Sequence, residues 1–355
     1  NLSFAEEFLE CTNIEKSGDV VTLTIAAAAN LEAPRNAVIT LSSATESASS
    51  TVIFTVEQEG NINPIDIGSF IALDDDPDSW FRIKGYVTSI NNIAKGRFDL
   101  TDATGKVYCY NIATEKGGST NLTGKFEVGD VVTIVAYKTT YSGTIEAVGY
   151  LEAVEKVTVS TLAQMTANRT SGATVEGTVV AVSKQGFVID DGTDAAYVYA
   201  GKTFDPTLFK IGDKAKVKVA DGKNVVYNFA TEINGYEIAF KSGSVADFVQ
   251  PKPKTADAAF LDAAVAAIDG KDKSKDDLVS VEYVTIEGKL SKSGNYYNIV
   301  IDGTAVQCSV SNPLDSLNLD ALDGKNITIS GYAMGISGSG TKYYNFIAVS
   351  AAEKK

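Results

Sequence analysis

The stretch that decides the fold is FRIKGYVTSINNIAKGRFDLTDATGKVYCY, residues 81–110. Apolar residues alternate with polar ones in three short runs, and turn residues separate these runs. The same order of runs returns at residues 175–200 and 286–310. The spacing from a glycine in the first run to an aspartate after the second is 17, 14 and 14 residues, for Gly85 and Asp102, Gly177 and Asp191, and Gly288 and Asp302. Three copies in matching order indicate an internal repeat.

Each copy continues with two more alternating runs. The first of these two begins near Gly129, Gly212 or Gly324 in the respective copy. Five strands with a longer connection between the third and the fourth are typical of an OB-fold barrel. A glycine in the first strand suits a barrel that bends sharply there, because glycine has no Cβ to clash. We therefore predict an all-β protein with three tandem OB-fold barrels and short helices, at residues 62–158, 159–252 and 253–355.

Residues 1–61 have their own pattern, and we predict a small β-sandwich there. β-rich runs at residues 20–26, 37–41 and 51–57 are split by polar segments. The stretches AAAANLEAPRNAVITLSS and TVEQEG resemble the Bacteroidetes-associated carbohydrate-binding (BACON-like) module, which implies a carbohydrate-binding role. That family has more strand before this point, where NLSFAEEFLECTNIEKSG stands here, so the head is either truncated or divergent at its start.

The three repeats resemble the OB-fold domains of Bacteroidetes envelope and secreted proteins, and more distantly the nucleic-acid-binding OB-folds. The residues that carry the likeness are IKGYV with LTDATG, VEGTV with IDDGT, and IEGKL with IDGT. This resemblance implies the fold and a location in the cell envelope or outside the cell. It does not imply the ligand, because one barrel architecture hosts many ligands.

The charge and the residue composition make some classes of function less favoured. The chain has 355 residues, a net charge of −14 and no histidine. Its acidity repels phosphate backbones as a whole, and no apolar run approaches the length of a membrane span. Because the chain begins at Asn1 rather than Met, removal of a signal or anchor segment is compatible with the sequence. The residues indicate neither a cofactor nor an oligomeric state.

We expect no catalytic activity. The absence of histidine removes His-based triads and most catalytic zinc sites, and no P-loop, GxSxG, CxxC or HExxH motif is present. Cys109 and Cys308 occupy equivalent positions where the second copy has Val198, which predicts small core sites rather than a disulfide or a reactive thiol. Asp74, Asp76 and Asp78 are a calcium candidate, but without the EF-hand spacing a solvated acidic turn is the favoured interpretation.

OB-folds bind ligands on the outer face of strands two and three. With Val107 and Cys109 facing inward, Tyr108 and Tyr110 face outward, and the same phase places Tyr197 and Tyr199 on the outside of the second barrel. Exposed tyrosine pairs can stack on sugars or on bases. The alternative is that neighbouring loops or domains cover them.

The first copy also carries a local excess of positive charge. Residues 82–110 hold Arg82, Lys84, Lys95, Arg97 and Lys106 against Asp99 and Asp102, a net charge of +3 in an acidic chain. Arg82, Lys84 and Arg97 therefore join the four tyrosines as candidate ligand-binding residues. A mixed, solvated face is the alternative interpretation.

These observations predict a non-catalytic, modular binding or adhesion protein, with glycan as the leading ligand class because of the head. Two alternatives stay open. One is single-stranded nucleic-acid binding through the first barrel, which is less favoured, and the other is a spacer that displays neighbouring domains. Salt separates the two ligands, because phosphate contacts weaken steeply with added salt and stacking on a neutral sugar does not.

Overall fold

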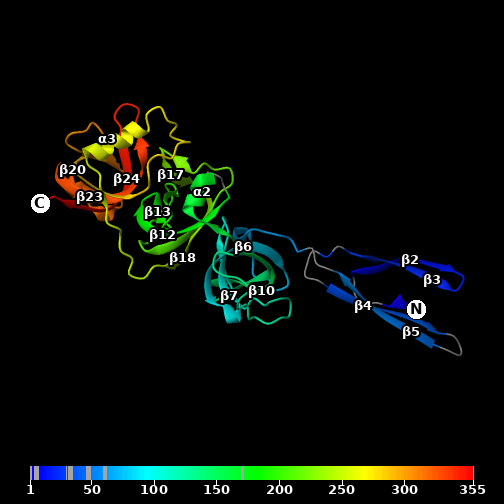
Figure 1. Ribbon diagram of the computed structural model, residues 1–355. Coiled ribbons are helices and arrows are strands. Elements are labelled where there is room, and N and C mark those ends of the chain that lie inside the picture. The colour runs from blue at the N-terminus through cyan, green and yellow to red at the C-terminus, as the bar shows by residue number, and fades with distance from the viewer. Residues whose placement is uncertain are drawn as a thin grey trace. The chain divides into compact units, whose positions relative to one another are not determined.

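A computed structural model describes residues 2–3, 8–28, 30, 35–44, 49–58, 62–168 and 172–354. The chain divides into two compact units, Asn1–Lys156 and Val157–Lys355. The first unit contains the head and the first barrel, and the second contains the other two barrels (Figure 1). In the described part of the chain, no helix has the length and apolar character needed to cross a membrane.

The head consists of two small sheets. One contains β1 (Leu2–Ser3), β4 (Arg35–Ala44) and β5 (Ser49–Gln58), and the other pairs β2 (Leu9–Ser17) with β3 (Val20–Ala27). Leu9, Ala37 and Ile39 are buried between them, which confirms a small sandwich. Strand β2 lies in the segment that departs from the BACON-like pattern. Residues 29, 31–34 and 59–60, which carry part of that resemblance, lie outside the described residues.

The first barrel is closed, in the strand order β10-β8-β7-β6-β9. Its strands are β6 (Phe81–Asn92), β7 (Arg97–Thr101), β8 (Lys106–Cys109), β9 (Val131–Tyr141) and β10 (Thr144–Glu155). Only β8 and β10 pair in parallel among these strands, as the predicted OB-fold order requires. Buried Phe98, Leu100 and Cys109 fill the interior, so the predicted core position of Cys109 is confirmed.

The third barrel repeats this order with β20 (Tyr283–Ser293), β21 (Tyr296–Val300), β22 (Gln307–Val310), β23 (Asn326–Ser337) and β24 (Tyr343–Glu353). Pairing of β20 with β23 closes it, and Cys308 is buried inside. Both buried cysteines are free thiols, and burial raises their pKa.

The second barrel has a fifth strand that breaks in two. Its strands are β12 (Thr174–Ser183), β13 (Gly186–Asp190), β14 (Ala195–Tyr199), β15 (Asp213–Val219), and the halves β17 (Ala230–Asn234) and β18 (Tyr236–Ser244). The halves are joined at Gly235, whose φ of +124° suits glycine alone. One half pairs with β14 and the other with β15, so the ring closes through this residue.

The glycine of each first strand lies where the second strand crosses it closely. A Cβ on Gly85 would lie 2.7 Å from the carbonyl oxygen of Thr101, and a Cβ on Gly288 would lie 2.5 Å from that of Val300. A Cβ on Gly177 would lie only 3.0 Å from the Cβ of Ile189. These glycines are therefore needed for the close approach of two strands, and the predicted sharp bend stays a prediction.

A short helix precedes each barrel: α1 (Ile67–Ala72), α2 (Leu162–Asn168) and α3 (Ala258–Ala267), the last of which lies against β24 (Figure 1). The aspartate after the second strand holds the first two helices. An Asp102 carboxylate oxygen accepts from the backbone N–H of Ile67 at 2.8 Å, and Asp191 does the same for Leu162 at 2.7 Å. These aspartates thus have the structural role that the repeated turn predicts.

We expect Asp102→Ala to lower the free energy of unfolding by about 1–2 kcal/mol, because it leaves several backbone donors of α1 and of its own turn without a partner. Hydrogen exchange read by mass spectrometry measures the change in each barrel, because peptides from the first and third barrels are resolved separately. Asp302→Ala is the matched control, since Asp302 is exposed at the same turn of the third barrel. Equal losses in both variants would contradict this role.

Barrels two and three share one hydrophobic core. Tyr197 and Phe229 of the second barrel belong to the same cluster as Ala333 and Ile336 of the third. The predicted linker at residues 250–254 takes part in this contact, because Gln250 donates to the carbonyl oxygen of Val180 at 2.6 Å and accepts from the Tyr332 hydroxyl at 2.9 Å. The two barrels therefore form a single packed unit.

Candidate functional site on the first barrel

The outer face of β7, β8 and β10 is built by strand alternation. Because Phe98, Leu100, Val107 and Cys109 are buried inside, the residues between them point outward. The register places Tyr108 opposite Asp99 on one side and opposite Glu146 on the other. Tyr108 is half-buried, and that partial burial raises its pKa.

Tyr110 carries a stacked cation. The Arg97 guanidinium lies over its ring at 4.4 Å from the centroid, and the Arg97 Nη2 atom donates to the Tyr110 hydroxyl at 3.1 Å. The rings of Tyr108 and Tyr110 are 6.4 Å apart. Arg97 Nε is buried without a hydrogen-bond partner, and no other side-chain atom of the described residues is in that position. The guanidinium therefore stacks on the Tyr110 ring even though its Nε–H group has no hydrogen-bond acceptor.

Further aromatic side chains continue across the same face. The backbone N–H of Tyr110 donates to Ala147, so Tyr110 lies beside Val148, whose partner on β9 is Tyr137. Trp80 meets Tyr137 edge-on at 5.1 Å and lies 6.0 Å from Tyr150 on β10. All of these rings are half-buried. We call this set the aromatic strip; its members are Tyr108, Tyr110, Tyr150, Tyr137 and Trp80.

Two of the predicted basic residues are paired with carboxylates in the folded barrel, which favours the alternative of a mixed face. Arg82 makes a two-pronged ion pair with Glu152 at 2.5 and 2.6 Å, and Lys84 pairs with Glu155 at 2.6 Å. Glu146 lies on the same face, so adding these three glutamates changes the counted charge from +3 to zero. The count over residues 82–110 missed them because they come from β10, which follows later in the chain.

The second barrel does not present the predicted tyrosine pair. The prediction of an exposed ring is wrong for Tyr197, which is 1% exposed and hydrogen-bonds Ser183 Oγ at 3.2 Å. Tyr199 is half-buried and packs against the same shared core. Both side chains lie on the outer side of their strand, as alternation requires, but the third barrel meets the second there. The alternative of a covering domain holds for this barrel.

The acidic stretch before the first barrel forms a turn held by its own side chains. Asp76 accepts from the backbone N–H of Asp78 at 3.0 Å, and Asp75 pairs with Lys138 at 3.1 Å. Asp74 and Asp78 are exposed. Across the described residues, no three carboxylate or cysteine side chains converge as metal ligands would.

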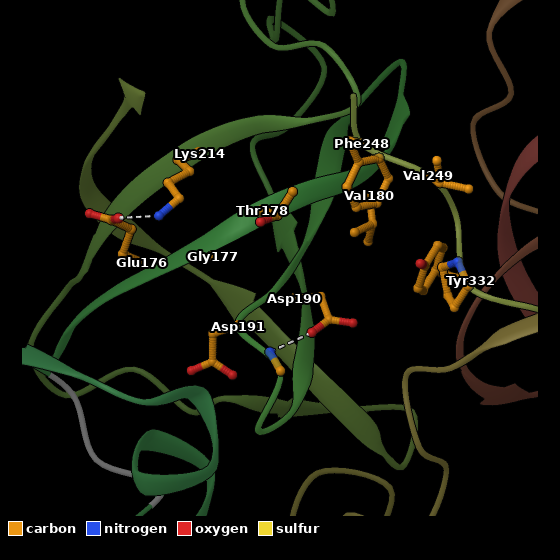
Figure 2. Close-up of a pocket in the computed structure, with 12 residues that line it drawn as sticks. Glu176, Gly177, Thr178, Val180, Asp190, Asp191, Lys214, Phe248, Val249 and Tyr332 are labelled. Carbon is orange, nitrogen blue, oxygen red and sulfur yellow. Dashed lines mark hydrogen bonds and ion pairs between the residues drawn. The ribbon is translucent and has the colours of Figure 1, made fainter. Parts of the chain in front are cut away.

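A cavity of about 480 Å³ lies in the second unit, between β12, the turn after β13 and the linker (Figure 2). Its carboxylates are already engaged. Glu176 faces Lys214 at 4.0 Å, Asp190 accepts from the Gly192 N–H at 2.7 Å, and Asp191 holds α2. Figure 2 shows Tyr332 and Val249 on the side of the cavity away from Glu176 and Lys214. These carboxylates thus make contacts within the unit.

No model of a known protein family matches this chain, and no curated protein matches it in sequence. A solved structure of a replication protein A heterotrimer bound to ssDNA is similar, with 11% identity over 78% of this chain and 94% of that chain. The TM-score of this match is 0.23, so it carries no argument about the ligand of this protein. The fold follows instead from the strand order itself.

Proposed function

We propose that this protein is a non-catalytic binding or adhesion protein whose first barrel binds a neutral glycan on the aromatic strip. The observation that carries this proposal is the combination of five half-buried rings with the pairing of Arg82 and Lys84 to carboxylates. Aromatic rings stack on the apolar faces of sugars. Carboxylates and a guanidinium beside them supply acceptors and donors for hydroxyl groups.

The pairing of charges argues for a neutral ligand. A phosphate backbone is held by lysine and arginine side chains that exchange counterions for phosphates. Here Arg82 and Lys84 each contact a glutamate, and Glu146 lies among the rings. The resemblance of residues 26–43 to the BACON-like module supports the same ligand class, and with it a location in the envelope or outside the cell.

Single-stranded nucleic acid is the second candidate. The Arg97 guanidinium over the Tyr110 ring favours it, because such a pair can stack on a base. Arg97 is, however, a single cation on a face where Arg82, Lys84 and Lys106 are neutralised by partners. The glycan therefore stays the leading proposal.

We expect Tyr110→Ala to weaken glycan binding by about 1–3 kcal/mol, the range for loss of one stacking ring. A glycan array identifies the oligosaccharide, and calorimetric titration then measures the affinity of each variant. Tyr296→Ala, an exposed tyrosine of the third barrel at 71% exposure, is the control and should bind as the parent does. Absence of any glycan ligand on the array, or equal binding by Tyr110→Ala, would contradict the proposal.

A further inference from the structure

A second, polar cavity of about 320 Å³ lies where the outer face of barrel two meets barrel three. Barrel two contributes β14, β17 and the short strand β16 (Val226–Tyr227), and barrel three contributes β23, β24 and the segment after β22. The volume is within the range of small-molecule sites. The residues on which its chemistry depends are Tyr199, Tyr227, Asn228, Glu232, Asn234 and Asn312.

Glu232 is the decisive group in this cavity. It lies on β17 beside Tyr197, its side chain lines the cavity, and the residue is only 4% exposed. Its carboxylate makes no hydrogen bond or ion pair with any residue that the structure describes. Burial raises its pKa to about 7. A carboxylate that faces a narrow cavity without a partner is poorly solvated, and a cation entering the cavity would compensate its charge.

The remaining lining is neutral. Among the residues that the structure describes, no lysine or arginine lines the cavity, and the other titratable groups of its lining are the phenols of Tyr197, Tyr199 and Tyr227. Lys184, whose backbone donates to the Asn312 carbonyl at 2.8 Å, directs its ammonium to Asp315. Asp277 accepts a hydrogen bond from the Thr231 hydroxyl. Because Thr231 directly precedes Glu232, its side chain points to the opposite face of β17.

Several polar groups remain available to a ligand. The side-chain amides of Asn228, Asn234 and Asn312 make no hydrogen bonds with the described residues, so their oxygens can accept from a bound donor. The rings of Tyr199 and Tyr227 offer π faces to a cation. Asn345 is different, because its amide already donates to Ser337 Oγ at 3.0 Å.

We propose that this cavity binds a small organic cation, whose ammonium or guanidinium group pairs with Glu232 and lies between the two tyrosine rings. A single carboxylate with amides and rings suits such a cation. A calcium ion takes six to eight oxygen ligands, usually including several carboxylates, and the cavity offers one carboxylate. A neutral sugar would leave the Glu232 charge uncompensated.

The proposal predicts a coupling to pH. Only the ionised carboxylate pairs with the cation, so the apparent affinity rises as pH increases through about 7, by about tenfold between pH 6 and pH 8. Binding at neutral pH also releases a fraction of a proton, which calorimetry in two buffers of different ionisation enthalpy detects.

The test is a calorimetric titration of the whole chain with millimolar arginine and, separately, with millimolar citrulline. Citrulline has nearly the same shape as arginine but carries a neutral urea group. We expect heat of binding with arginine and none with citrulline. N-acetyl-arginine amide separates the two sources of this chemistry: equal affinity indicates recognition of a basic peptide side chain, and weaker affinity indicates recognition of the free amino acid.

Glu232→Gln should lower arginine affinity at least tenfold and abolish its pH dependence, while a thermal melt verifies that the variant is folded. Glu237→Gln is the control, because Glu237 lies on β18 of the same barrel, is exposed and does not line the cavity. Equal binding of citrulline, unchanged affinity in Glu232→Gln, or no binding of arginine would overturn the proposal. None of these outcomes bears on the glycan site of barrel one.

Discussion

Tyr197→Ala is expected to lower the free energy of unfolding of the second unit by about 3–5 kcal/mol, the range for truncating a buried aromatic residue. The ring is 1% exposed within the core that barrels two and three share, and its hydroxyl contacts Ser183. Truncation therefore leaves a cavity in that core and removes a hydrogen bond. The same substitution would be mild if the ring stood on a free outer face.

Tyr108→Ala is the matched control, because Tyr108 occupies the equivalent strand position in the first barrel and is half-buried. We expect it to cost roughly 1 kcal/mol, in line with a partly exposed ring. Hydrogen exchange read by mass spectrometry measures both variants, since peptides from the two units are resolved separately. A small loss for Tyr197→Ala would contradict a shared core.

The second large effect is a loss of stability at rising pH. Burial raises the pKa of Glu232 to about 7, so the unfolded chain ionises first, from about 4.5 upward. Between these values the folded state holds more protons, and stability falls as pH rises. The loss reaches about 3 kcal/mol and levels off above pH 7 to 8.

Glu232→Gln should remove this slope and exceed the parent in stability at pH 8, because no charge is then buried. Hydrogen exchange of β14 and β17 peptides at pH 5.5 and pH 8, corrected for intrinsic exchange rates, measures the difference. Trp80, the single tryptophan, lies in the first barrel, so its unfolding signal serves as an internal control that the substitution should not change. A parent protein whose second unit gains stability toward pH 8 would contradict the assignment.

The barrels were predictable from the sequence because each repeat carries its own constraints. A glycine where two strands cross and an aspartate that holds the next helix recur at fixed spacing, as at Gly85 and Asp102. Alternation also identified the inward cysteines. The break of the fifth strand at Gly235 was not predicted, because a strand of alternating residues gives no sign of which half pairs with which neighbour.

The candidate site was only half predictable. Alternation gives the face to which a side chain points, but not what covers that face, so Tyr108 and Tyr197 look equivalent in sequence and differ in burial. The glutamates that neutralise Arg82 and Lys84 lie about 70 residues downstream, in the last strand. The second cavity had no such signal, because Glu232 lies in the mixed polar and apolar run ATEIN, residues 230–234.

The most direct test of the glycan proposal uses Trp80, which lies in the aromatic strip at 5.1 Å from Tyr137. Its emission is followed while the chain is titrated with the array-selected oligosaccharide and, separately, with single-stranded oligothymidylate, each at low and high salt. We expect the oligosaccharide to change the emission with an affinity that salt leaves nearly unchanged. A change with the oligothymidylate that weakens steeply with salt, and none with the oligosaccharide, would contradict the account.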